Sequence, residues 1–219
     1  NIPNQKKTLV MNPFNIDNIY KREKSRKWIN ELYDIPKDSI LFGYIGRLVD
    51  WKNVDFLIYC FSKYIKKSNL HIHLIIVGDG DNKYLDSLKK LTHKLEVKNI
   101  VTFAGFNSEP DRVISAFDLM IAPSNKEPFG RTLVEAMIQK TPILAARGGG
   151  HSEIINNEVT GRLYDHNNVD DFIDKCEIFF NNSESNYEII NKANDTAYIK
   201  YSAHKHAENI IQIYKNLSI

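Results

Sequence analysis

Two glutamates, Glu127 and Glu135, are the residues whose type and spacing most clearly indicate a binding or catalytic site in this chain. Ser124 and Glu127 match the Ser-x-x-Glu capping box, but Pro128 would then occupy the fourth helical position, where a helix needs the amide that proline lacks. The residue before a proline also favours an extended backbone. We therefore predict that a helix begins near Gly130, with Glu127 in the loop before it and Glu135 in its second turn.

The expected helix start is a candidate anion site. The free backbone amides of Arg131, Thr132 and Leu133 would point away from the helix, and Gly130 would allow a ligand to approach closely. The two carboxylates beside these amides suggest a site for a sugar and an anion. The alternative for Glu135 is a solvated side chain that favours the helix dipole.

A pair of cations, Arg47 and Lys52, lies in the sequence GRLVDWKN. Arg47 follows a predicted strand, and Lys52 lies just before or at a helix start, where its charge opposes the helix dipole by some tenths of a kcal/mol. A bound anion between the two side chains would reverse that cost. A diphosphate leaving group needs such fixed cations. The alternative is two unrelated surface cations.

Short apolar strands and helices alternate along most of the chain. The pattern predicts strands at 7–12, 40–47, 71–80, 99–106, 118–124, 142–147 and 161–165. It predicts helices at 53–68, 82–97, 109–117, 131–140, 152–155, 169–182 and 203–217, and a surface connector and helix after residue 15 anchored by Ile16, Ile19, Trp28 and Leu32. This order is typical of a Rossmann-like α/β fold, with a parallel sheet of about six strands and helices on both faces.

Ligands of such sheets bind beyond the carboxyl ends of the strands, where glycine-rich loops gather here. VGDG at 77–80 indicates a tight turn but lacks the third glycine of the dinucleotide fingerprint. ARGGGHSE at 146–153 would let backbone approach a ligand, or would form a loop before a short helix capped by Ser152. His151 is expected to be the only histidine at this edge, and the chain shows no metal-ligand spacing and no nucleophile–base arrangement.

Taken together, these motifs resemble the C-terminal, donor-binding domain of retaining GT-B glycosyltransferases of the family-four (glycosyl transferases group 1) type. The resemblance covers about residues 40–180. The matching segments run in the family's order: Gly46-Arg47 with Lys52, Gly78-Asp79-Gly80, FAGF at 103–106, Glu127-Pro128-Phe129-Gly130 with Glu135, Gly149-Gly150 with Glu153, and VTGRLY at 159–164.

The resemblance implies a role for each motif. Arg47 and Lys52 would hold the donor diphosphate, Glu135 the ribose hydroxyls, and Glu127 the hydroxyls of the transferred sugar. Glu127, Arg47 and Lys52 are thus the expected catalytic residues. The expected substrate-binding residues, including the loops that would flank the base, are Gly46, Gly78, Gly80, Phe103, Gly105, Phe106, Phe129, Gly130, Arg131, Thr132, Leu133 and Glu135. The donor would be a nucleotide-diphospho-sugar, with no metal and no cofactor.

The resemblance also implies that this chain is half an enzyme. Residues 1–39 would be a linker strand and basic connector from a missing N-terminal, acceptor-binding domain. Residues 40–182 would be the nucleotide-sugar-binding domain, and 183–219 a helical extension packing back toward the missing domain. The acceptor would be a glycan, lipid or protein, and the fragment alone would transfer nothing.

Three other functions fit parts of the sequence. A non-catalytic nucleotide-sugar-binding module would share the fold. The sequence retains both glutamates and both cations, which argues against this alternative. A phosphorylase-like enzyme would need a cofactor-anchoring lysine, for which no clear candidate exists. A signalling α/β domain would need an acidic phospho-acceptor pocket, which the sequence lacks.

Composition narrows the partners and the compartment. The net charge of +2 gives no argument for nucleic acid. The basic stretch 20–28 could contact an anionic membrane or the missing domain, although such a run is more often a solvated helix face. No stretch approaches the roughly 18 apolar residues of a membrane span. Cys60 and Cys176 are expected to be buried free thiols. We therefore expect a cytoplasmic protein, one that could also contact the inner face of a membrane.

Overall fold

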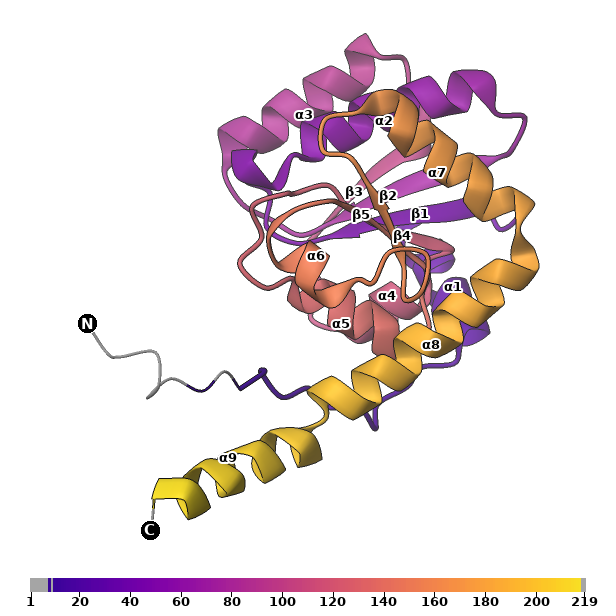
Figure 1. The fold of residues 1–219 in the computed structure, drawn as a ribbon. Coiled ribbons are helices and arrows are strands. Elements are labelled where there is room, and N and C mark those ends of the chain that lie inside the picture. Colours follow the sequence, from indigo (N-terminus) through magenta and orange to yellow (C-terminus); the bar gives the residue numbers. More distant parts are fainter. Residues whose placement is uncertain (1–7, 9, 218–219) are drawn as a thin grey trace.

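A six-stranded parallel sheet forms the centre of the molecule (Figure 1). The computed structural model describes residue 8 and residues 10–217. The strand order is β3-β2-β1-β4-β5-β6, and every neighbouring pair is parallel. The strands are β1 (Ile40–Ile45), β2 (Ile72–Val77), β3 (Val101–Gly105), β4 (Leu119–Ala122), β5 (Ile143–Ala146) and β6 (Arg162–Tyr164). The predicted Rossmann-like fold class is confirmed.

Helices cover both faces of this sheet (Figure 1). One face carries α2 (Val54–Lys67), α3 (Asn82–Lys94) and α7 (Val169–Asn181). The other carries α1 (Arg22–Tyr33), α4 (Pro110–Ser115), α5 (Arg131–Ile138), α6 (Gly149–Ile154) and α8 (Ser183–Tyr201). Helix α9 (Ala203–Leu217) extends away from this body, and two short 3-10 turns are η2 (Asp50–Lys52) and η3 (Lys98–Ile100).

Apart from the edge strand β3, the strands are mostly buried on both faces, which explains their nearly continuous apolar sequences. All six side chains of β2 are buried, and they alternate between the two cores. Leu74 and Ile76 pack with the α2–α3–α7 face, whereas Ile75 and Val77 pack with the α1–α4–α5–α8 face. The sheet is therefore a rigid middle layer that fixes where its loops emerge.

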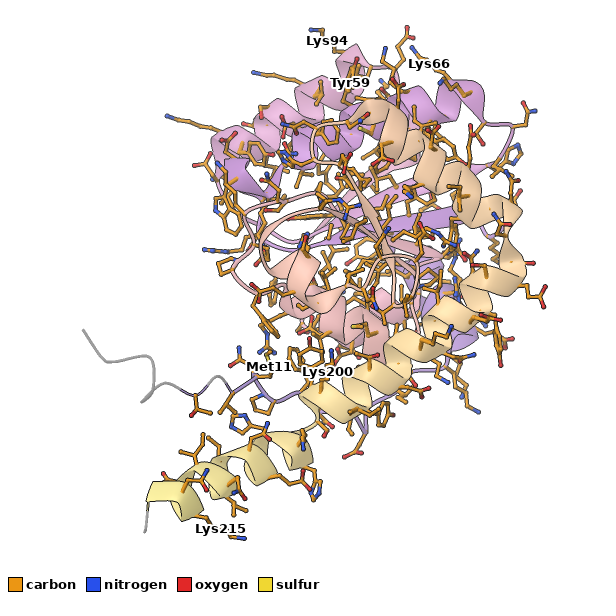
Figure 2. The ribbon with its side chains drawn as sticks, in the orientation of Figure 1. Met11, Tyr59, Lys66, Lys94, Lys200 and Lys215 are labelled. Atoms are coloured by element: carbon orange, nitrogen blue, oxygen red, sulfur yellow. The ribbon has the colours of Figure 1, made fainter. Side chains whose placement is uncertain are left out.

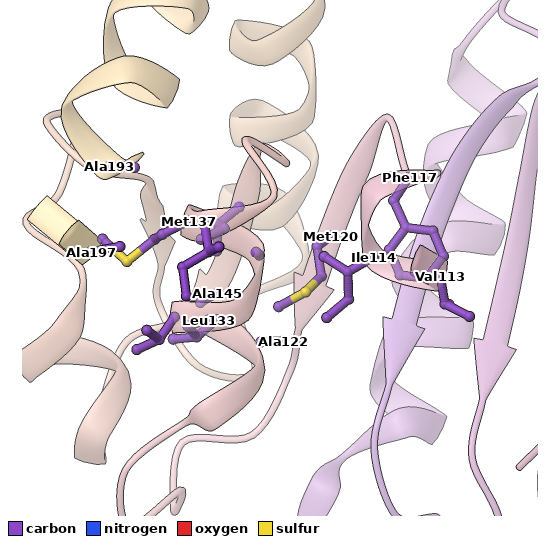
Figure 3. Packing of buried hydrophobic residues seen from close by; sticks show 14 of the residues in the cluster. Val113, Ile114, Phe117, Met120, Ala122, Leu133, Met137, Ala145, Ala193 and Ala197 are labelled. Carbon is purple, nitrogen blue, oxygen red and sulfur yellow. The ribbon is translucent and has the colours of Figure 1, made fainter. Parts of the chain in front are cut away.

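Helix α8 is the element that the sequence pattern does not resolve individually. Its buried residues lie mostly three or four positions apart, but they include two asparagines and the small residues Ala193 and Ala197, so the apolar pattern is weak. Met137 of α5 lies against these alanines (Figure 3). Asn194 donates from Nδ2 to the carbonyls of Met137 and Ile138, both at 3.1 Å, which satisfies the end of α5. Helix α8 thus holds the helix that starts at the candidate anion site.

The N-terminal segment differs from its prediction. Residues 1–7 and 9 lie outside the described part of the chain, and the described residues of the expected strand at 7–12 form no strand. In helix α1, Ile29 is the fully buried anchor. The expected anchors Ile19 and Leu32 are 46% and 52% exposed, so this part of the prediction is wrong.

Part of the basic stretch 20–28 makes contacts within the fold. Arg22 and Arg26 both pair with Asp118, at 2.5 and 2.7 Å, and Arg112 of α4 stacks over Trp28 at 4.1 Å. Its two arginines are therefore structural. Of its lysines, Lys27 lies 3.9 Å from Glu31, whereas Lys21 and Lys24 are exposed. No helix in the described ranges combines the length and the apolar character that crossing a membrane requires.

Both cysteines are buried free thiols, as predicted. Burial raises the pKa of Cys60 to about 12 and raises that of Cys176 well above its ordinary value. Neither thiol is therefore a reactive thiolate at neutral pH.

Histidine 73 makes the stability of this fold depend on pH. It is buried in β2 with Nε2 2.8 Å from Thr102 Oγ1. Burial, with a smaller contribution from Arg26, lowers the pKa of His73 in the folded chain. The unfolded chain has the ordinary value of about 6.5, so it binds the proton more readily. The stability from neutral His73 is therefore present above pH 6.5 and is lost as the pH falls below it.

We predict that the melting temperature falls between pH 7.5 and pH 5.5, and that His73→Gln makes this fall shallower. A difference of 1 kcal/mol corresponds to about 2–4 °C in a chain of this size, which thermal melts resolve. His71→Gln, two residues earlier and on an exposed side chain, is the matched control and should leave the slope unchanged. Equal slopes for native chain and His73→Gln would contradict this assignment.

Candidate functional site

The loops after β1 and β2 are joined by their backbones at the carboxyl edge of the sheet. Leu48 accepts from the N–H of Asp81 at 3.1 Å and donates to Asp79 at 2.8 Å. A Cβ added at Gly78 would lie 1.9 Å from Gly46 O, and one at Gly80 would lie 2.2 Å from Leu48 O. These two glycines are therefore required by the contact between the loops, whatever they do for a ligand.

A hollow of about 410 Å³ lies beside these loops. This is within the range of small-molecule sites. Phe106, which is 72% exposed, is one of its walls. The lining residues are Ile45, Gly46, Arg47, Val77, Gly78, Asp79, Phe106, Asn107, Ser108 and Pro110.

Four predicted substrate-binding or catalytic residues thus meet here: Gly46, Arg47, Gly78 and Phe106. Gly80 and Gly105 border the loops without lining the hollow. Phe103 lies in mid-strand, packs against the α2–α3–α7 core and does not line the hollow, so its expected place beside the base stays a prediction.

Lys52 and Glu127 form an ion pair at the centre of the site. Lys52 comes from η2 after β1, and Glu127 comes from the loop between β4 and α5. Their side chains are only 16% and 18% exposed, and the ammonium also lies 4.4 Å from the centre of the Trp51 ring. The sequence assigns these residues to different parts of a ligand, whereas the structure places them in direct contact.

Arg47 is the exposed cation of the pair predicted from GRLVDWKN. Among the residues that the structure describes, no carboxylate pairs with its guanidinium. Its carbonyl accepts a hydrogen bond of 2.9 Å from the Tyr44 hydroxyl, and burial raises the pKa of that phenol, so it remains a donor. The backbone of the Gly-Arg loop is therefore fixed while the charged end of Arg47 is available.

Helix α5 begins where Pro128 predicts. Gly130 is its N-cap residue with φ 96°, a conformation that favours glycine, and Arg131 is the first helical residue. No side chain caps this end. Leu133 already donates to Gly130 O at 3.0 Å, so the expectation that its amide is free is wrong. The amides of Arg131 and Thr132 have no acceptor among the described residues, so they remain available to an anion at this helix start.

Glu135 is not the solvated residue of the alternative interpretation. Its side chain is mostly buried and lies 3.5 Å from Arg131. Burial raises the pKa of Glu135, the nearby charge of Asp111 raises it further, and Arg131 opposes both. Burial also raises the pKa of Asp111. Sequence reasoning missed Asp111, because nothing in the pattern shows that the start of α4 faces α5.

Two histidines lie at this edge, not one. His151 is buried in α6, with Nδ1 3.1 Å from Ala146 O, so that nitrogen carries the proton. Burial lowers the pKa of His151, while Glu127 and Lys52 act on it in opposite directions. His166, which we expected elsewhere, lies with Nε2 3.1 Å from the Asn53 side-chain amide. In the described ranges no three metal-ligating side chains gather.

The glycines at 148–150 pack on the loop from Asn125 to Phe129. Gly150 donates to Glu127 O at 2.7 Å, and a Cβ added there would lie 2.2 Å from Phe129 O. Helix α6 begins at Gly149, so Ser152 does not cap it in the way we expected. The Ser152 hydroxyl instead accepts from the amide of Gly148 at 2.8 Å. This loop is a support for the residue that pairs with Lys52.

Comparison with known proteins gives consistent matches. The family described as glycosyl transferases group 1 matches residues 25–196. The poly(ribitol-phosphate) alpha-N-acetylglucosaminyltransferase of Staphylococcus aureus is 29% identical over 209 residues, which cover 95% of this chain and 41% of that protein. An uncharacterized glycosyltransferase of Methanocaldococcus jannaschii is 31% identical over 183 residues, 83% of this chain and 46% of that protein. This chain therefore spans less than half the length of either relative.

A solved structure agrees with this fold. HepE of Anabaena, in complex with UDP, has a TM-score of 0.86 to this chain at 23% identity, covering 95% of this chain and 57% of that one.

Substituting Gly150 tests whether the glycine loop supports the site. We predict that Gly150→Ala lowers the stability by about 1–3 kcal/mol, because the new methyl group meets backbone that cannot move freely. Thermal melts should show a fall of about 2–4 °C in Tm for each kcal/mol. Gly161→Ala is the control. The atoms nearest to its new methyl group would be side-chain atoms of Ile155, at 3.2 Å, and not backbone. Equal losses for the two variants would refute the supporting role.

Proposed function

This chain belongs to the glycosyl transferases group 1 family, and we propose that it is the donor-binding half of a glycosyltransferase that uses a nucleotide-diphospho-sugar. The observation that carries this proposal is the order of groups along one edge of the sheet. The hollow beside Arg47, the free amides at the start of α5, the buried Glu135 and the Lys52–Glu127 pair follow one another around it.

Each part of the donor has a matching group. The nucleoside base lies in the hollow against Phe106, and the diphosphate lies between Arg47 and the amides of Arg131 and Thr132. The ribose hydroxyls donate to Glu135, because an ionised carboxylate accepts two such bonds. Arg131 opposes the rise in the pKa of Glu135 that burial and Asp111 cause, which favours the ionised form that this role needs.

The Lys52–Glu127 pair belongs at the glycosidic bond. Lys52 pairs with Glu127 and holds its carboxylate in place as an acceptor for the hydroxyls of the transferred sugar, and the same ammonium extends the cationic end of the phosphate site. Fixed cations at this position stabilise charge on the departing phosphate. The proposed reaction therefore needs no metal, and the acceptor attacks the face that the leaving group vacates, with retention.

We propose UDP as the donor nucleotide. HepE of Anabaena was solved with UDP and with UDP-glucose, and this chain has the same fold. The acceptor, a saccharide, lipid or protein, would contact residues outside this chain, since the chain spans less than half of its curated relatives. The chain alone would accordingly bind donor and transfer nothing. A non-catalytic module would bind the same donor, but it would have no need for a buried cation beside the transferred sugar.

Thermal shift with nucleoside diphosphates tests donor binding. We expect UDP to stabilise the chain by RT ln(1 + [L]/Kd), about 2.7 kcal/mol at one hundred times its Kd, and to exceed GDP and ADP. Glu135→Ala should weaken UDP binding by about 10–100-fold, because a hydrogen bond to a charged group contributes about 1.5–3 kcal/mol.

Glu188→Ala provides the control for this experiment. Glu188 is an exposed glutamate of α8 with an ion pair to Lys192, the same kind of i,i+4 pair that Glu135 makes with Arg131. This variant should bind UDP with native affinity by calorimetry. Stabilisation by none of the three nucleotides, or native affinity in Glu135→Ala, would contradict the proposed site.

A further inference from the structure

Three aromatic rings meet beside the loop from Glu127 to Gly130, which we call the donor loop. Phe14, Phe129 and Tyr201, the aromatic triad, have ring centres 6.0–6.2 Å apart. Phe14 and Phe129 are stacked, and Tyr201 meets both of them edge-on. These separations lie within the range in which aromatic pairs attract one another.

The triad joins three segments that are far apart in the sequence. Phe14 belongs to the N-terminal segment, and Tyr201 ends α8. The amide of Phe14 donates to Tyr201 O at 2.9 Å, and Phe14 also bridges to Ser202. Figure 2 shows Met11 and Lys200 where the N-terminal segment passes the end of α8. The segment around Phe14 and the end of α8 therefore reach the Glu127–Gly130 loop at the same point.

The third ring, Phe129, lies in the loop that carries Glu127. It is also next to Gly130, the N-cap of α5. A second contact runs through Arg131, whose guanidinium lies 4.7 Å from the Phe14 ring centre and 3.5 Å from Glu135. Phe14 thus contacts the loop that carries Glu127. It also contacts Arg131, which pairs with Glu135.

We propose that Phe14 and Tyr201 are positioning residues for the donor site, and that they hold the Glu127–Gly130 loop and Arg131 in the arrangement that binds donor. This inference rests on the proposed function. Phe14 and Tyr201 are buried, so their rings form a fixed surface for the partly buried Phe129. Without that surface the loop samples more conformations, and the apparent affinity falls with the fraction that is competent to bind.

Coupling of this kind is reciprocal. A donor that binds better when the triad is closed must stabilise the closed triad by the same free energy. The hydrogen bond from the Phe14 amide to Tyr201 O is a direct reporter, because amide exchange at Phe14 requires that bond to open. UDP should therefore slow hydrogen exchange at Phe14, although Phe14 has no part in contacting the nucleotide.

A second aromatic cluster provides the matched control. Phe42, Tyr64 and Phe180 stack at 5.9–6.4 Å, and Phe180, like Phe129, is partly buried. This cluster packs on the α2–α3–α7 face, away from α5. Loss of its partly buried ring should lower stability without changing the donor loop.

The experiment compares UDP affinity by calorimetry with Tm in four variants of this chain. Tyr201→Leu and Phe14→Leu should weaken UDP binding at least about fivefold. Tyr201→Phe, which keeps the ring, should retain native affinity. Phe180→Leu should lower Tm with native affinity.

Hydrogen exchange at the Phe14 amide, with and without UDP, provides a readout in the native chain that stands if a leucine variant does not fold. Native UDP affinity in both leucine variants overturns the inference while leaving the donor site intact. Exchange at Phe14 that UDP does not slow overturns it as well. Absence of UDP binding by the native chain refutes the proposed function and this inference together.

Discussion

The ion pair between Lys52 and Glu127 is the interaction on which the site depends. Two mostly buried opposite charges attract strongly where water is partly excluded, and removing one partner leaves the other uncompensated at a cost of about 3–5 kcal/mol. The pair therefore has to be held by rigid surroundings. The sheet supplies them, because β1 leads into η2 and β4 leads into the loop that carries Glu127.

Backbone contacts that only glycine permits fix the loops around this pair. Gly78 and Gly80 allow the loops after β1 and β2 to touch, and Gly150 allows the loop before α6 to support Glu127. A glycine-rich edge is often interpreted as space for a ligand. Here the chain itself fills the space beside Gly78, Gly80 and Gly150. The hollow, the exposed guanidinium of Arg47 and the amides of Arg131 and Thr132 remain for a ligand. Rigidity of this kind is what a site needs in order to stabilise charge without rearranging.

Local sequence rules predict the parts of this molecule that depend on local physics. Alternating strands and helices predict the sheet, and Pro128 predicts the start of α5 within one residue. The errors come from contacts between distant segments. The ion pair joins residues 75 positions apart, and the Asp111–Glu135 interaction joins two helices whose packing no periodicity reveals. The sequence pattern does not delimit helix α8, because its buried positions include alanines and asparagines and only two large apolar side chains, Ile189 and Tyr201.

The most direct test of the account is a crystal structure of this chain with UDP. The account predicts that the uracil lies in the hollow against Phe106 and that the ribose hydroxyls lie within hydrogen-bond distance of Glu135. It predicts that the β-phosphate contacts Arg47 and the amides of Arg131 and Thr132, on the side that faces the Lys52–Glu127 pair. UDP bound elsewhere, or bound here with its phosphates pointing away from the start of α5, would contradict the central claim.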